Sequence, residues 1–186
     1  MTDRPIEFLI NANGQAPRNL RDAIRRVHNS SHGFRSSWLA GDLHGAYETS
    51  QEAFVELDYI QNELLRQRDA RNNAAAWLGS QLEVVLQSNV GRICSPVSAQ
   101  DASWFRALPS QAGCLPPGST PDDLSLGAAL NKLKHRTTSL LNFYLPANGG
   151  HLLYVLTSAS MGKPETLCEI DVLQFCSNCT AAAACV

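Results

Sequence analysis

The sequence of 186 residues has no long hydrophobic run. Apolar stretches such as Leu152 to Leu156 are far shorter than the roughly 20 residues that a membrane-spanning helix needs. The N-terminal residues MTDRPIEFLINANGQ also lack the basic segment and the long apolar segment of a secretory signal. We therefore expect a cytoplasmic protein without a membrane partner.

A strong net charge is also missing. The 15 basic and 17 acidic residues give a formal net charge of −2, which excludes a strong overall field that would attract nucleic acid or a membrane. Lysine is scarce, because only three of the basic residues are lysines and 12 are arginines. Guanidinium groups suit carboxylate and phosphate recognition. Any charged binding surface must therefore be a local patch.

Common catalytic motifs are absent too. The sequence contains no Gly-x-Ser-x-Gly elbow, no phosphate-binding loop and no Gly-x-Gly-x-x-Gly. It therefore gives no positive evidence for catalysis, and we expect a binding protein rather than an enzyme. In a reducing compartment, we expect the six cysteines to be free thiols or metal ligands rather than disulfides.

The residues that are present favour one globular domain over residues 1–186, because 44% of them are hydrophobic and can form a core. Apolar spacing predicts a helix from about Arg18 to His28. A capping box at Thr49 and Glu52 begins an apolar stripe that continues to about Gln87. We interpret it as two helices that meet near Asn72 and Asn73 as a helical hairpin.

A third long helix is predicted from Thr120 to Tyr144, because Thr120-Pro121-Asp122-Asp123 has the composition of a helix start. Two strands, Leu152 to Thr157 and Leu167 to Phe175, form a predicted antiparallel hairpin. The strand predicted at Pro5 to Asn11 is a candidate third member of this small sheet. The expected class is α+β, with a long ordered loop at residues 91–119 and a flexible tail at residues 177–186.

A basic stripe is predicted on the first helix. At about 100° per residue its members project within a sector of about 80°, opposite the apolar face. Such a stripe could dock on an acidic partner or follow phosphates. The stripe comprises Arg18, Arg21, Arg25, His28 and His32.

Trp104 and Phe105 form an aromatic pair in the predicted loop. Aromatic and arginine side chains contribute much of the binding energy of protein interfaces. We therefore predict two partner-binding surfaces, the basic stripe and this loop.

The C-terminal cysteines are candidate metal ligands. Cys176, Cys179 and Cys185 could bind zinc with a fourth ligand from Cys94, Cys114 or a histidine. A structural zinc site usually has two paired-ligand elements, and the sequence has one, so we expect no cofactor, with zinc as an alternative. A redox Cys-x-x-Cys pair and free thiols in a frayed tail are the other interpretations. Cys168 is expected to be a buried core residue.

The segment GDLHG, from Gly41 to Gly45, resembles the first metal-binding motif of the calcineurin-like metallophosphoesterases. The resemblance covers five residues and implies metal-binding roles for Asp42 and His44. The two downstream motifs of that family do not occur in this sequence. Our interpretation of the segment is a glycine-rich loop that leads into the cap at Thr49.

Together these features predict a small intracellular binding protein, either an adaptor, an inhibitor or a regulatory factor, that acts through protein contacts. The first alternative is a nucleic-acid-binding protein that uses the basic stripe. The second is a zinc-binding protein or metal-dependent hydrolase with histidine and cysteine ligands.

Overall fold

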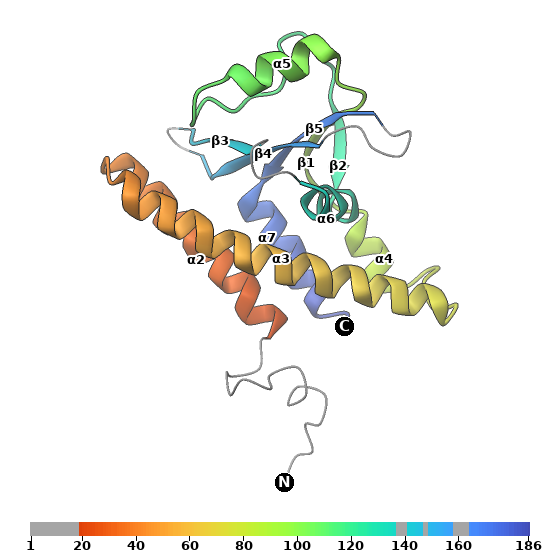
Figure 1. Ribbon diagram of the computed structural model, residues 1–186. Helices are drawn as coiled ribbons and strands as arrows, with labels where there is room; N and C mark the ends of the chain where they lie inside the picture. Colours follow the sequence, from red (N-terminus) through yellow and green to blue (C-terminus); the bar gives the residue numbers. More distant parts are fainter. Residues whose placement is uncertain (1–18, 137–140, 147–148, 158–163) are drawn as a thin grey trace.

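The computed structural model describes residues 19–136, 141–146, 149–157 and 164–186. A five-stranded sheet separates two groups of helices (Figure 1). Helix α5 (Ala99–Ala107) lies on one side of the sheet, and the remaining described helices lie on the other. The predicted α+β class, with a helical hairpin and a small antiparallel sheet, is confirmed.

The helical hairpin is formed by α2 (Leu20–Leu39) and α3 (Leu43–Asn73). The Asn19 side chain caps α2 by accepting from the backbone N–H of Arg21, and Asp42 caps α3 by accepting from Gly45. The helices turn at residues 40–42, where Gly41 has a φ of 76°. The predicted hairpin near Asn72 and Asn73 is thus misplaced. Between those residues and about Gln87, where the second helix of the hairpin was predicted, the chain forms only the short helix α4 (Gln81–Leu86).

All pairs of neighbouring strands are antiparallel, in the order β2-β1-β5-β4-β3. Strands β4 and β5 form the predicted C-terminal hairpin, with Leu152 opposite Asp171 and Thr157 opposite Thr166. The strand predicted at residues 5–11 lies outside the described residues. The strand bounds are β1 (Asn89–Cys94), β2 (Asp122–Ser125), β3 (Leu141–Tyr144), β4 (Leu152–Thr157) and β5 (Thr166–Asp171).

The third long helix, predicted over residues 120–144, is wrong for most of its length. Residues 122–125 form β2, which pairs with β1, and residues 141–144 form β3, which pairs with β4. Among the described residues of this range, only α6 (Leu126–Lys134) is helical, and Ser125 caps it by accepting from the backbone N–H of Ala128. Tertiary pairing decided this region, because strand formation depends on neighbours distant in sequence.

Two other predicted irregular segments are ordered elements. The predicted loop at residues 91–119 includes most of β1 and all nine residues of α5. The predicted flexible tail is wrong as well, because residues 172–183 form helix α7 (Val172–Ala183). Asp171 ends β5 and caps α7 by accepting from the backbone N–H groups of Leu173 and Gln174. The strand predicted to reach Phe175 therefore stops at Asp171.

The main hydrophobic core joins α2, α3, α4, α6 and α7 to one face of the sheet. Ile60, Leu64, Leu130 and Cys168 are fully buried in it. A second cluster fills the opposite face beneath α5, around Phe105, Leu156 and Leu167. A third, small cluster lies at the α2–α3 turn. Since β4 and β5 supply residues to both larger clusters, the sheet connects them.

Among the described helices, none has an apolar segment long enough to cross a membrane.

Candidate functional site

The outer face of α2 and the neighbouring helix α7 form a surface depression that we name the α2–α7 groove. It consists of a lower hollow of about 380 Å³, beside Arg21 and His28, and an upper hollow of about 460 Å³, beside His32 and Arg35. Leu173 of α7 lines both hollows. The wall supplied by α2 is made of Arg21, Arg25, His28, His32 and Arg35. On the α7 side the lower hollow is lined by Leu173, Cys176, Ser177 and Thr180.

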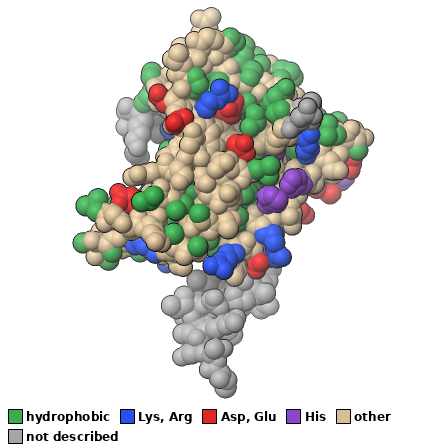
Figure 2. Space-filling view, turned by 180° about the vertical axis from the view of Figure 1, so that it is seen from behind, with side chains coloured by type: hydrophobic (Ala, Val, Ile, Leu, Met, Phe, Trp, Pro, Cys, Tyr) green, Lys and Arg blue, Asp and Glu red, His purple; other side chains and the backbone are tan. Residues whose placement is uncertain are grey.

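The predicted stripe is partly described. Arg21, Arg25 and His28 line one hollow and His32 lines the next, so the helical period does bring these four together. Arg18 lies outside the described residues. Figure 2 shows arginine or lysine and histidine side chains along a band on this face. The rings of His28 and His32 are in edge contact, with centroids 4.7 Å apart.

Charge is unevenly distributed across the groove. Arg21 makes no ion pair with a described residue, and Arg25 pairs with Asp22 at 3.1 Å on the exposed surface of the same helix. Facing them, the twelve residues of α7 include no charged side chain. The guanidinium of Arg35 donates to the backbone carbonyls of Pro146 and Gly149 and thereby holds these residues against α2. Arg35 was not part of the predicted stripe.

His151 lies where the upper hollow meets an apolar pocket of about 440 Å³ between α2, α3 and β3. Its Nδ1 atom is 3.3 Å from the Ser31 hydroxyl, and its ring stacks on Phe34. Burial lowers the pKa of His151 to about 4, so the imidazole is neutral at physiological pH. A neutral histidine with one serine contact can exchange hydrogen bonds with a ligand, and it adds no charge to the pocket.

The aromatic pair lies on α5. Phe105 is only 3% exposed and packs in the second cluster, while Trp104 is partly buried against the same cluster. Phe105 therefore supports the fold from inside and is not on a surface that a partner can reach. Trp104 is the member of the pair with solvent-accessible area.

The three candidate zinc ligands lie on or just after α7. Cys176 and Cys179 are buried in the main core, and Cys185 is partly exposed. Burial raises the pKa of Cys176 to about 12 and that of Cys179 well above its usual value, which keeps both thiols protonated. Within the described part of the chain, no three histidine, cysteine, aspartate or glutamate side chains converge as a metal site.

Asp42 and His44 have local structural contacts. Asp42 is the cap of α3, and His44 Nε2 lies 3.2 Å from Glu48 Oε1 one turn along that helix. The glycine-rich segment is thus the turn of the helical hairpin, rather than a loop that leads into a helix at Thr49.

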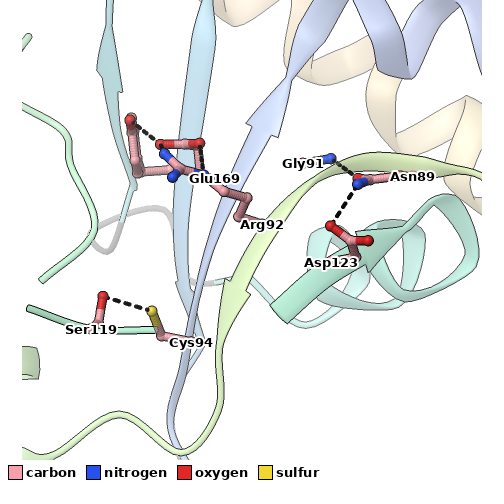
Figure 3. A network of polar contacts seen from close by, with 8 residues as sticks. Asn89, Gly91, Arg92, Cys94, Ser119, Asp123 and Glu169 are labelled. Atoms are coloured by element: carbon pink, nitrogen blue, oxygen red, sulfur yellow. Dashed lines mark hydrogen bonds and ion pairs between the residues drawn. The ribbon is translucent and has the colours of Figure 1, made fainter. Parts of the chain in front are cut away.

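A row of polar side chains crosses the sheet on the face toward α5, and sequence reasoning missed it. Arg92 of β1 is directly opposite Glu169 of β5, which is directly opposite Tyr154 of β4. Arg92 Nε and Nη2 donate to the two carboxylate oxygens of Glu169 at 2.7 and 2.9 Å (Figure 3). The Tyr154 hydroxyl donates to Glu169 Oε2 at 2.6 Å.

The row is held together by burial. Glu169 and Tyr154 are 7% and 2% exposed, whereas the Arg92 side chain is 55% exposed. Burial, followed by the hydrogen bond to Glu169, raises the pKa of Tyr154, and the hydrogen bond from Arg92 to Glu169 raises the pKa of Arg92. The one signal in the sequence was a charged residue, Glu169, flanked by the apolar residues Leu167, Cys168 and Ile170.

No family model, no curated protein and no solved structure matches this chain.

Proposed function

We propose that this protein is an adaptor or regulatory factor that binds an acidic segment of a protein partner in the α2–α7 groove. The supporting observation is the charge asymmetry, since α2 lines the groove with arginine and histidine while α7 has no charged side chain. An acidic segment would provide the countercharges that α7 lacks. The proposal includes a cytoplasmic location for this binding.

The floor of the groove favours a segment that also carries apolar side chains. Ile24 and Cys176 are 3% exposed and lie beside Leu173, which lines both hollows. Protein interfaces typically place an apolar centre inside a polar rim. A chain that alternates acidic and apolar residues would place carboxylates against α2 and apolar groups against this floor.

The distribution of the other arginines supports the same surface. Six described arginines outside the groove pair with a carboxylate within 3.2 Å, as Arg25 does with Asp22 inside it, whereas Arg21 pairs with no described carboxylate. These six are Arg26, Arg66, Arg68, Arg92, Arg106 and Arg136. The groove therefore offers an acidic partner a cationic patch on a chain whose formal net charge is −2.

Nucleic-acid binding is the second candidate, because a line of cations along a helix of 20 residues also suits phosphates. We favour a protein partner because no aromatic side chain alternates with the cations on this face, as base stacking requires. Trp104 stays a predicted second contact, and replacing it with alanine would test it once a partner is known.

The test compares a fluorescent peptide of alternating glutamate and leucine with single- and double-stranded oligonucleotides as probes. An exposed ion pair contributes about 0.2–1 kcal/mol, and charge reversal adds repulsion. The double variant Arg21→Glu and Arg25→Glu should thus weaken peptide binding by about tenfold or more. The matched control is Arg66→Glu and Arg106→Glu, which changes the net charge equally at exposed arginines outside the groove.

Circular dichroism establishes that each variant is folded. Peptide binding that is lost in the groove variant and retained in the control supports the proposal. Equal losses in the two variants would exclude the groove as the binding surface. Tighter binding of an oligonucleotide, with an affinity that falls steeply as salt increases, would replace the protein partner by nucleic acid.

A further inference from the structure

The face of the sheet toward α5 contains a further hollow, separate from the α2–α7 groove. Its volume is about 460 Å³, within the range of about 300–1,000 Å³ typical of small-molecule sites. The floor is the Arg92–Glu169–Tyr154 row, and the chain from Ala112 to Pro121 forms part of the wall. We name it the sheet cavity.

The wall lies close against the floor because of a glycine. A Cβ atom at Gly113 would collide with the ring of Tyr154, and the Gly113 N–H donates to the Phe143 carbonyl at 3.0 Å. The backbone at Gly113 thus packs directly on the polar row. This contact gives the cavity a defined shape on one side.

Arg92 is the one charged group of the row that is accessible. Its Nε and Nη2 atoms are used by Glu169, and its Nη1 atom makes no hydrogen bond to a described residue. Glu169 is in turn held by the buried Tyr154 hydroxyl. The guanidinium is therefore fixed on one edge, and the remaining donors are free for a ligand with little further loss of side-chain entropy.

The remaining lining limits the charge of that ligand. Arg92 is the only arginine or lysine among the described residues that line the cavity. Burial, and then the charge of Glu169, raises the pKa of Cys114, so that thiol stays protonated and adds no charge. Tyr144, Leu115 and Leu152 supply aromatic and apolar wall. Glu169 also lines the cavity and balances the charge of Arg92, so the free Nη1 donors of this one guanidinium, beside an apolar wall, suit at most one carboxylate on an apolar body.

We propose that the sheet cavity binds a small monocarboxylate with an aromatic or alicyclic body, whose carboxylate is held by Arg92 and whose ring contacts Tyr144. A charge-assisted bond to a guanidinium is about twice as strong as a neutral one, so the carboxylate is preferred to an amide of the same shape. A dianionic phosphate would need a second cation.

The test uses benzoate and indole-3-acetate as probes, with benzamide and phenyl phosphate as charge controls, in ¹H–¹⁵N NMR titrations of the full chain. Both carboxylates should shift the amide resonances of Gly113 and Cys114. Arg92→Lys keeps a cation beside Glu169 and loses the planar donor edge, so it should weaken binding by about tenfold. The matched control is Arg106→Lys, because Arg106 is an arginine on α5 that pairs with Glu165. This variant should bind both carboxylates as the wild-type protein does.

Tyr144→Ala provides a second variant whose folding does not depend on the buried row, because Tyr144 is 43% exposed. It should also weaken binding of both carboxylates. The proposal is overturned if neither carboxylate shifts these resonances, if benzamide binds as tightly as benzoate, or if phenyl phosphate binds more tightly. Unchanged binding in both Arg92→Lys and Tyr144→Ala overturns it as well.

Discussion

At the scale of single residues, the hydrogen-bond partners of a buried polar group decide whether a charge on that group is compensated. His151 and Glu169 both lie against the sheet, yet their environments differ. His151 has one serine contact and aromatic neighbours, so it remains neutral. Glu169 accepts three hydrogen bonds, two of them from a guanidinium, so its charge is compensated.

His151 should make the protein less stable in mild acid. Burial lowers the pKa of His151 from 6.5 to about 4, so between these values the unfolded chain binds a proton that the folded protein does not. Above pH 6.5 the His151 side chain does not lower the free energy of unfolding. As the pH falls toward 4, it lowers the free energy of unfolding by up to about 3 kcal/mol. Urea unfolding across this range measures the loss.

The comparison is with His151→Phe, which retains an aromatic ring beside Phe34 and cannot take up a proton. Carboxylates titrate in both proteins, so the difference between the two pH profiles isolates His151. Parallel profiles would show that His151 does not resist protonation in the folded protein.

Breaking the Arg92–Glu169 pair should be costly. Arg92→Ala leaves a buried carboxylate without its cation, and we expect the free energy of unfolding to fall by about 2–4 kcal/mol, since Arg92 itself is partly solvated. Adding Glu169→Leu removes the unpaired charge and should restore more than half of the loss. Chemical denaturation of the two variants and the wild-type protein tests this, and a double variant less stable than Arg92→Ala contradicts it.

At the scale of elements, the same local pattern gave different structures depending on what packs beside it. The leucine spacing over residues 120–144 suits a helix. Residues 122–125 and 141–144 are nevertheless strands, because they pair with β1 and β4. Residues 177–186 were predicted to be a flexible tail. Small residues instead let α7 pack closely, and Ala182 is fully buried.

Thiol labelling distinguishes an ordered α7 from a frayed tail. Under native conditions at about pH 8, Cys114 and Cys185 should react first, because they are the more exposed thiols. Cys176 and Cys179 should react only after unfolding, since burial raises the pKa of both. Mass spectrometry after timed alkylation gives the order. Rapid labelling of Cys179 in the native protein would mean that α7 frays.

At the scale of the whole molecule, the two larger cores share the central strands. Val155 and Cys168 face the main cluster, while Leu156 and Leu167 on the same strands face the second. Loss of β4 and β5 would expose both clusters together. The fold should therefore unfold as one cooperative unit.

The three tryptophans can test that cooperativity, because each packs against a different cluster. Trp77 contacts the main cluster, Trp104 the second and Trp38 the third. We would make three single-tryptophan variants, each with phenylalanine at the other two positions. In each variant, the urea midpoint from tryptophan fluorescence should equal the urea midpoint from circular dichroism. A fluorescence transition that separates from the circular dichroism of the same variant would indicate an independent unit.

The sequence alone determined the features that depend on neighbours within a few residues. The apolar and cationic faces of α2 follow from the helical period, and the β4–β5 hairpin follows from two apolar runs on either side of a turn. Such local features predict the α+β class and four residues that line the groove, namely Arg21, Arg25, His28 and His32. Phe105 was predicted to contact a partner from a loop, but it is buried on α5, and its burial could not be read from its type.

The tertiary structure alone decided the rest. Arg92 and Glu169 are 77 residues apart and become a pair only when β1 and β5 align in register. His151 becomes neutral only when aromatic side chains from α2 and β3 enclose it. Whether a leucine-rich segment is a helix or a strand depends on which distant backbone completes its hydrogen bonds. Such contacts are non-local, so no window of the sequence contains both partners.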